Sequence, residues 1–347
     1  MMRTVRTIFM VAIVLIEGAA GLSQAKGLPV DTPMVHDPVM AREGNVWHLY
    51  STGLGLSHFT SSDLKHWQID TVAVLRNLPQ WTHDSVPGFD RHVWAPDILH
   101  WHGQWWLTYS CSTFGRNTSA IGLATSPTLA GARWTDRGCV VASHGGRDNW
   151  NAIDPNVVID EHDRPWLVFG SFWDGIQLVP LNDSLHVVDG QQPVTIARRW
   201  DLSRRLSHTT SDSVEAGTNA IEAPFIFRHG PYYYLFVSWD YCCQGMKSNY
   251  RVAYGRSRNV EGPYLDREGR DMLLGGGTLL FEGDKKELEA LGHCAVYADP
   301  SGSDKALFIC HGYSIPLQGA PVLVLRTLQF SRDGWIAKRS NSKNTGS

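Results

Sequence analysis

Charged side chains are scarce in this sequence, and neither sign dominates. Only 19% of the 347 residues are Asp, Glu, Lys or Arg, and the formal net charge is -3. There is no basic stripe of the kind that binds a phosphate backbone, so we expect no nucleic-acid partner. The sequence also has no long stretch with the 3.6-residue apolar period of a helix, which argues against a largely helical fold.

No apolar run near the start of the chain is long enough to cross a membrane. The run over residues 8–16 follows Arg3 and Arg6 and falls short of the roughly 20 apolar residues that a membrane helix needs. Small residues come next, and Ser23-Gln24-Ala25 resembles a cleavage site. This pattern predicts a signal peptide over residues 1–25, a single mature domain over residues 26–347, and secretion.

The six cysteines do not show the paired spacing of a zinc site. Four are scattered along the chain, whereas Cys242 and Cys243 are adjacent. An even number fits an exported protein, because disulfides persist outside the cytoplasm. The sequence leaves open whether Cys242 and Cys243 are bonded to each other or are two buried thiols.

The sequence is instead rich in short strand-like runs that recur as one unit. Runs of Val, Ile, Tyr, Phe and Trp alternate with Gly, Asp and His turns, and five segments end in a hydrophobic strand followed by Ser, Gly or His. Each of these five strands contains one anchor residue. Successive anchors are 59, 60, 67 and 73 residues apart. The anchors are Tyr50, Tyr109, Phe169, Phe236 and Ile309. A pair of β-sandwiches would not repeat at this period, so we predict an all-β fold, a five-bladed β-propeller.

Acidic residues recur near the start of these units. Asp37 and Asp154 directly precede a proline at the beginning of a strand-like stretch, and Glu222 lies two residues before Pro224. Asp97 and His293 take the corresponding places in the second and fifth units. Because the innermost strands of a propeller line its channel, we expect these five positions to be equivalent and to converge at one mouth. Asp97 follows its proline instead of preceding it, and we expect it to bind backbone at the channel wall.

Convergent carboxyls in an exported, aromatic-rich protein suggest hydrolysis of a glycosidic bond. One protonated carboxyl donates to the leaving oxygen, and a second acts on water or on the anomeric carbon. Glu222 has the most apolar neighbours, which raise the pKa of a carboxyl, so it is the candidate acid. Asp37 and Asp154 have more polar neighbours and are expected to stay ionised.

Several motifs, in order along roughly residues 30–335, resemble glycoside hydrolase family 43, above all its endo-α-1,5-L-arabinanase branch. The motifs that carry the resemblance are His36-Asp37-Pro38, Trp94-Ala95-Pro96-Asp97, Ala152-Ile153-Asp154-Pro155-Asn156, Phe169-Gly170-Ser171-Phe172, Ala220-Ile221-Glu222-Ala223-Pro224 and Leu291-Gly292-His293.

The resemblance implies cleavage of internal α-1,5-L-arabinofuranosidic bonds of arabinan, as in pectin side chains, with inversion. Asp37 would be the general base, Glu222 the general acid, and Asp154 the residue that orients Glu222 and adjusts its pKa. His293 matches a histidine that holds a metal, usually calcium, with water in the channel. Cys294 departs from the Asn that follows this histidine in the family. We expect a monomer.

Five further residues are candidate sugar contacts. Trp94 and Phe114 could stack on a sugar ring or pack in the core; Phe114 lies in a polar loop that resembles the cleft floor of arabinanases. Asn156 and Ser171 could bind the substrate or form turns. Cys242 follows a channel-side strand and resembles a Cys-Cys run that lies near the substrate in arabinanases.

Other functions are compatible with these residues. An exo-acting α-L-arabinofuranosidase or β-xylosidase of the same family would share the three acids. A fructan hydrolase or transferase would carry an Asn-Asp-Pro motif in its first unit, whereas the Asp154-Pro155-Asn156 motif lies in the third. A non-catalytic carbohydrate-binding propeller would need the aromatic residues but not three acids at one mouth.

Overall fold

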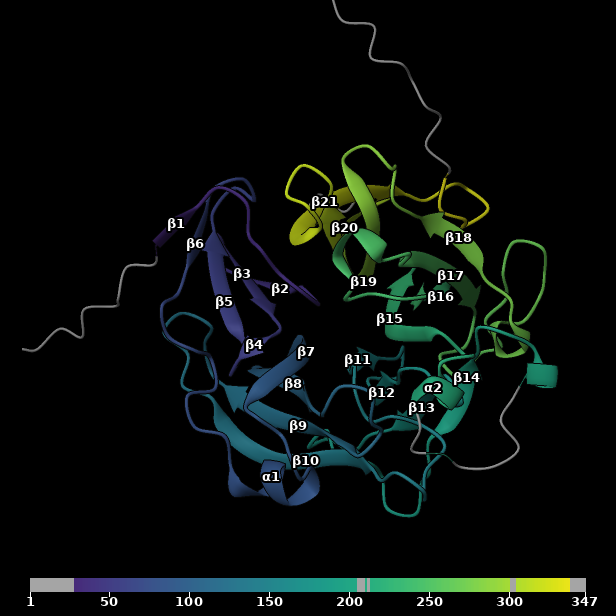
Figure 1. Ribbon diagram of the computed structural model, residues 1–347, viewed down its shortest axis with the longest axis horizontal. Helices are drawn as coiled ribbons and strands as arrows, with labels where there is room; N and C mark the ends of the chain where they lie inside the picture. Colours follow the sequence, from purple (N-terminus) through teal and green to yellow (C-terminus); the bar gives the residue numbers. More distant parts are fainter. Residues whose placement is uncertain (1–27, 205–209, 211–212, 300–303, 338–347) are drawn as a thin grey trace, which may run out of the picture.

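Five antiparallel sheets surround a central axis in the computed structural model, which describes residues 28–204, 210, 213–299 and 304–337 (Figure 1). The predicted all-β, five-bladed β-propeller is confirmed. The predicted signal peptide, residues 1–25, lies outside the described residues. Among the described residues, no helix is long and apolar enough to cross a membrane.

Each blade is a small sheet whose innermost strand contacts the innermost strands of its neighbours. From inside to outside, the first blade contains β2 (Val39–Glu43), β3 (Val46–Ser51), β5 (Ser57–Ser61), β6 (Trp67–Ile69) and β1 (Leu28–Val30). The second contains β7 (His92–Trp101), β8 (Gln104–Cys111), β9 (Ser119–Ser126) and β10 (Thr135–Ser143), and β4 (Gly53–Leu54) pairs with the inner edge of β7.

The remaining three blades have four, four and three strands. The third contains β11 (Asn156–Ile159), β12 (Pro165–Phe169), β13 (Ile176–Pro180) and β14 (Val194–Ala197). The fourth contains β15 (Ile221–His229), β16 (Tyr232–Trp239), β17 (Arg251–Ser257) and β18 (Thr278–Phe281), and the fifth β19 (Leu288–Ala298), β20 (Lys305–Ser314) and β21 (Ala320–Gln329). The helices are short: α1 (Gln80–Ser85), α2 (Ser213–Ala216) and single 3-10 turns at Leu202–Arg204, Gly245–Lys247 and Met272–Leu274.

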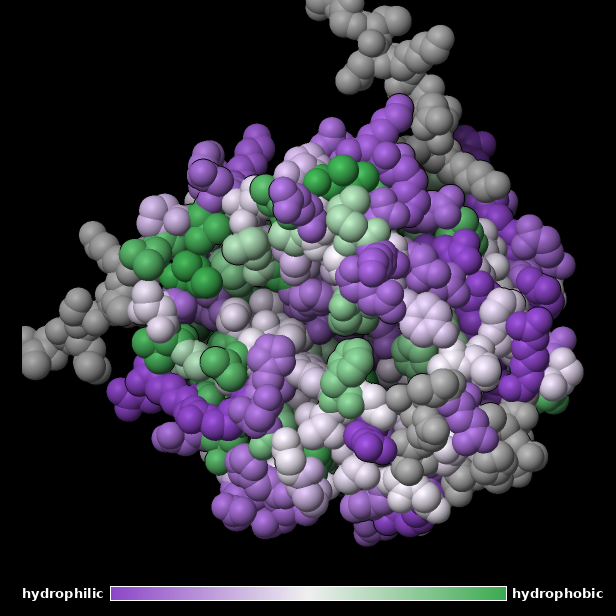
Figure 2. Space-filling model, in the orientation of Figure 1, coloured by the Kyte–Doolittle hydropathy of each residue, from purple (hydrophilic) through white to green (hydrophobic). Residues whose placement is uncertain are grey.

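The anchor residues of the sequence repeat occupy the second strand of every blade and are fully buried. Around them, apolar clusters join one blade to the next; one such cluster contains Ile121 and Leu123 of the second blade with Leu167 and Val179 of the third. Burying a side chain of this size stabilises the fold by about 1.5–3 kcal/mol. Exposed apolar side chains, in contrast, form small separate patches among polar residues on the face shown in Figure 2.

The chain before β2 joins the first blade to the last. Residues Leu28–Val30 pair with β6 at the outer edge of the first blade. A few residues later, the carbonyl of Pro33 accepts a hydrogen bond from the amide of Leu323 at 3.0 Å, and Val35 donates to the carbonyl of Pro321 at 3.2 Å. The same short segment therefore holds both ends of the ring of blades.

A residue with positive φ precedes or interrupts the innermost strand of every blade. The five residues are Asp37 (53°), Ala95 (42°), Asp154 (58°), Ala223 (53°) and His293 (52°). A non-glycine residue in this region costs of order 1–3 kcal/mol, so it persists only where the surroundings enforce it. These are the equivalent positions of the repeat, and the predicted equivalence is wrong for two residues: Asp97 lies two positions after Ala95, and Glu222 one position before Ala223.

The backbone amide of each of these five residues donates a hydrogen bond to a side chain of the preceding blade. We call these five bonds the interblade ring. They join Asp37 to Nδ1 of His311 (3.2 Å), Ala95 to Oγ1 of Thr52 (2.9 Å), Asp154 to Oγ of Ser110 (3.0 Å), Ala223 to Oδ2 of Asp154 (3.1 Å) and His293 to Oγ of Ser238 (2.8 Å). In the second, fourth and fifth blades the position coincides with an irregularity in the strand pairing, which removes the amide from the ladder. A buried amide needs a partner, and the neighbouring blade supplies it.

We predict that Ser110→Ala destabilises the protein by about 1–3 kcal/mol, because the amide of Asp154 loses its acceptor in a buried place. Thermal unfolding measures the change, with Ser62→Ala as the control, since Ser62 is exposed. A melting temperature equal to that of the Ser62→Ala variant would contradict a stabilising role for the interblade ring.

Candidate active site

Three carboxyls from three blades converge at one mouth of the channel. Asp37 lies two residues before β2, Asp154 two residues before β11, and Glu222 on β15. Asp154 accepts the amide of Ala223, the residue after Glu222, and the charge of Asp37 acts on the pKa of both other acids. The sequence prediction that these acids come together is therefore confirmed.

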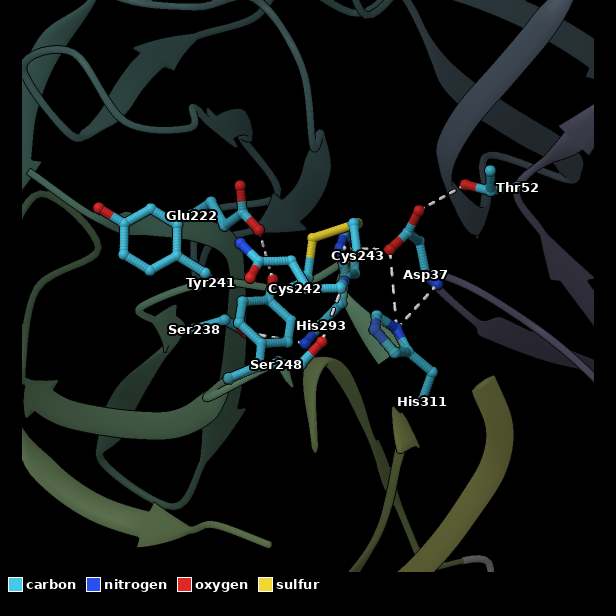
Figure 3. The surroundings of a disulfide bond; sticks show 12 residues. Asp37, Thr52, Glu222, Ser238, Tyr241, Cys242, Cys243, Ser248, His293 and His311 are labelled. Atoms are coloured by element: carbon cyan, nitrogen blue, oxygen red, sulfur yellow. Dashed lines mark hydrogen bonds and ion pairs between the residues drawn. A yellow bond between two sulfur atoms is a disulfide. The ribbon is translucent and has the colours of Figure 1, made fainter. Parts of the chain in front are cut away.

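Asp37 is held by side chains of the first and fifth blades. Oγ1 of Thr52 donates to Oδ2, and Nδ1 of His293 lies 3.0 Å from Oδ1 (Figure 3). Burial by itself would raise the pKa of Asp37, but the charge and hydrogen bond of His293, with smaller effects of His311 and His36, bring it well below its usual range. The carboxylate is therefore ionised at neutral pH, as predicted.

Glu222 is in the opposite state. Both of its oxygens bind hydroxyl groups: Oε2 accepts from Oγ of Ser171 at 2.8 Å, and Oε1 accepts from the phenol of Tyr250 at 2.8 Å. Burial raises the pKa of Glu222, the two hydroxyls lower it only in part, and the net shift is upward. This environment favours a protonated carboxyl, in agreement with the predicted acid.

Asp154 is buried beside this pair. Burial raises its pKa to about 8; the charge of His293 opposes the rise, and the carboxyls of Glu222 and Asp37 add to it. The expectation that a polar neighbour, Asn156, keeps Asp154 ionised is contradicted. The side chain of Asn156 instead donates a hydrogen bond to Asp97 and accepts one from the backbone amide of Ile226. The charges of Glu222 and Asp37 therefore disfavour an ionised Asp154.

His293 completes the group from the fifth blade. Burial lowers its pKa, but the charge and hydrogen bond of Asp37 outweigh this effect and raise the pKa to about 9. Since Nδ1 faces Asp37, Nε2 is the nitrogen left for a metal, in the carboxylate–histidine–metal order common in metal sites. One imidazole is compatible with a calcium ion whose remaining ligands are water oxygens.

The residues around His293 limit the ligands that a metal bound there could have. Cys294 is buried in the apolar cluster that also contains Cys310, so it takes no part in a polar shell around His293. Within the described part of the chain, the group of three potential ligands that comes together is His36, Asp37 and His311, without His293. Two imidazoles and one carboxylate suit zinc or copper better than calcium.

The family model described as glycosyl hydrolases family 43 matches residues 27–336. The chain belongs to this family. It is 42% identical over 306 residues to the extracellular exo-α-(1→5)-L-arabinofuranosidase ArbA of Cellvibrio japonicus, covering 87% of this chain and 85% of the relative. It is 37% identical over 331 residues to the extracellular endo-α-(1→5)-L-arabinanase 1 of Bacillus subtilis, covering 91% and 94%.

Among solved structures, an exo-1,5-α-L-arabinanase from a bovine ruminal metagenomic library is similar to this chain with a TM-score of 0.80. The two sequences are 48% identical, and the similarity covers 88% of this chain and 97% of the other. The predicted membership of family 43 is confirmed, and this family 43 chain is a glycosidase.

The predicted sugar contacts of this family 43 glycosidase fall into two groups. Phe114 is 83% exposed, so it is not a core residue. Trp94 is half-buried, with its indole N–H bonded to His92 at 2.8 Å. These two residues present aromatic surface to solvent, and their contact with a sugar stays a prediction.

The polar candidates bind protein groups. Asn156 joins three blades through its bonds to Asp97 and Ile226, and Asp97 also accepts the amide of Val157 at 2.8 Å, which confirms its backbone-binding role. Ser171 holds Glu222. Substrate contacts by Asn156 and Ser171 stay predictions, but each already has a structural partner.

Cys242 and Cys243 are bonded to each other, which answers the question that the sequence left open. Figure 3 shows this vicinal disulfide together with Asp37, Glu222 and His293. Cys242 packs against the cluster of Tyr250, Ala290 and Tyr313, and the amide of Cys243 donates to the phenol of Tyr313 at 2.6 Å. The oxidised pair fits the predicted export of the protein.

The sequence prediction missed five residues that hold the acids and His293: Thr52, Ser110, Ser238, Tyr250 and His311. Three of them could have been found, because Thr52, Ser238 and His311 each lie two residues after a repeat anchor. Tyr250 has no counterpart in the repeat, and no signal in the sequence marks it.

Proposed function

We propose that this protein is a secreted, inverting glycosidase that hydrolyses α-1,5-L-arabinofuranosidic bonds of arabinan. The observation that carries the proposal is the opposite protonation of two carboxyls at one mouth. Asp37 is ionised beside His293, and Glu222 is kept protonated by burial. Environments that push two carboxyl pKa values apart are how glycosidases assign an acid and a base. The names of the relatives support arabinan as the substrate and the extracellular space as the location.

In this mechanism Glu222 protonates the departing glycosidic oxygen, and Asp37 takes a proton from the water that attacks the anomeric carbon on the opposite face. Although Oδ1 and Oδ2 of Asp37 each have a protein partner, a carboxylate has about four acceptor sites, so a water can still bind. Asp154 holds the Ala223 amide next to the acid, and burial together with the charge of Asp37 keeps the pKa of the acid high.

We predict that Asp37→Asn and Glu222→Gln each lower turnover on arabinan by about 10²–10⁴-fold, the usual loss when a general base or acid is removed. Melting temperatures and an Asp31→Asn control at an exposed carboxylate separate this loss from misfolding. Near-normal turnover in either variant would remove the role assigned to that residue. Proton NMR of the first product should show the inverted anomer; a retained one would make Asp37 a nucleophile.

The mode of attack has two candidates. The sequence motifs predict endo action, whereas the relatives favour exo action, because the chain is 48% and 42% identical to proteins named as exo-acting and 37% identical to one named as endo-acting. We therefore propose exo action as the leading mode. On linear arabinan we expect steady release of small sugars with a slow fall in viscosity. A rapid fall in viscosity with little sugar released would restore the endo prediction.

We further propose that a hydrated calcium ion binds Nε2 of His293. A bound ion adds positive charge near the carboxyls, which favours their ionised forms. Elemental analysis should find about one calcium per wild-type chain and none in His293→Ala, with His144→Ala as the control at an exposed histidine. Metal content is the readout because His293→Ala also removes the partner of Asp37. Calcium retained by His293→Ala would mean that another residue is the ligand.

A further inference from the structure

The proposed acid is held by a buried phenol. The hydroxyl of Tyr250 donates to Oε1 of Glu222 at 2.8 Å. Tyr250 lies directly before β17, whereas Glu222 lies on β15, so the bond joins two different segments of the fourth blade.

Both oxygens of the carboxyl have a hydroxyl donor. The phenol of Tyr250 donates to Oε1, and Oγ of Ser171 donates to Oε2, each at 2.8 Å. The two bonds therefore hold the plane of the carboxyl in one orientation.

Packing holds Tyr250 in the position from which its phenol reaches Glu222. Its side chain is 1% exposed, and its ring stacks on that of His311 with centroids 5.8 Å apart. On another side the ring lies over Gly292, where an added Cβ would meet Cδ1 of Tyr250 at 2.1 Å. Only a glycine at position 292 leaves room for the ring. Gly292, on β19, therefore allows the phenol of Tyr250 to reach Glu222 on β15.

We infer that Tyr250 is a positioning residue for Glu222: its hydrogen bond to Oε1 fixes the orientation of the carboxyl. This inference rests on the proposed role of Glu222 as the general acid. The competing possibility is that the phenol and the carboxyl only satisfy each other in the core. The two differ in one respect, since a positioning residue matters only when the leaving group needs a proton.

The test compares two substrates with the same arabino-oligosaccharide donor, one with a sugar leaving group and one with a nitrophenolate, which departs without protonation. For Tyr250→Phe, which keeps the ring, we expect kcat on the sugar substrate to fall about 10- to 100-fold and kcat on the nitrophenyl substrate to change little. The alkaline limb of the pH profile should move to higher pH, because the phenol stabilises the ionised form of Glu222 and its loss raises that pKa.

Two other variants make the result decisive. Tyr264→Phe removes a buried phenol that donates to the carbonyl of Val260, away from the acids, and should lower only the melting temperature. Glu222→Gln tests the acid itself and should lose turnover on the sugar substrate alone.

The outcomes separate the two claims. An equal loss on both substrates in Tyr250→Phe, with an unmoved alkaline limb, would overturn the positioning role while Glu222→Gln still reports an acid. An equal loss on both substrates in Glu222→Gln would instead overturn the proposed function at its acid, whatever Tyr250→Phe shows.

Discussion

The amide bonds of the interblade ring are the constraint on which the rest of this structure depends. Each joins the left-handed residue of one innermost strand to a side chain of the preceding blade. Three of the five left-handed residues are Asp37, Asp154 and His293, and a fourth, Ala223, directly follows Glu222. The bonds that join the blades therefore also orient the acids, and a shift of one blade would move a carboxyl.

Electrostatics then assigns different states to carboxyls of the same chemical type. Burial acts on all three, but only Asp37 has a cationic partner at hydrogen-bond distance, His293. Glu222 has two neutral hydroxyls, which only partly offset the effect of burial. Asp154 has a backbone amide and the like charges of its neighbours, and its pKa rises to about 8. Partner identity, more than depth of burial, separates an ionised carboxyl from a protonated one at this mouth.

The repeat made much of this arrangement predictable. Anchor residues at regular spacing led to five blades, and blades around a channel led to convergent acids, both of which the structure shows. The prediction was wrong where it treated the acids as strictly equivalent, because a proline motif does not reveal which residue takes the positive φ. It was also wrong for Asp154, since Asn156, its neighbour in sequence, faces a different blade.

The sequence by itself determined the fold class, the number of blades, the family and the acids that converge at one mouth, because each of these depends on local pattern and on spacing along the chain. Only the tertiary structure decided that the pKa of Asp154 is raised, that Cys242 and Cys243 are bonded, and that Tyr250 reaches Glu222. The first and the last of these depend on contacts between segments whose separation in the sequence carries no signal. The phenol of Tyr250 lies 28 residues from the carboxyl that it holds, and it reaches that carboxyl because Gly292, on a third strand, leaves space for its ring.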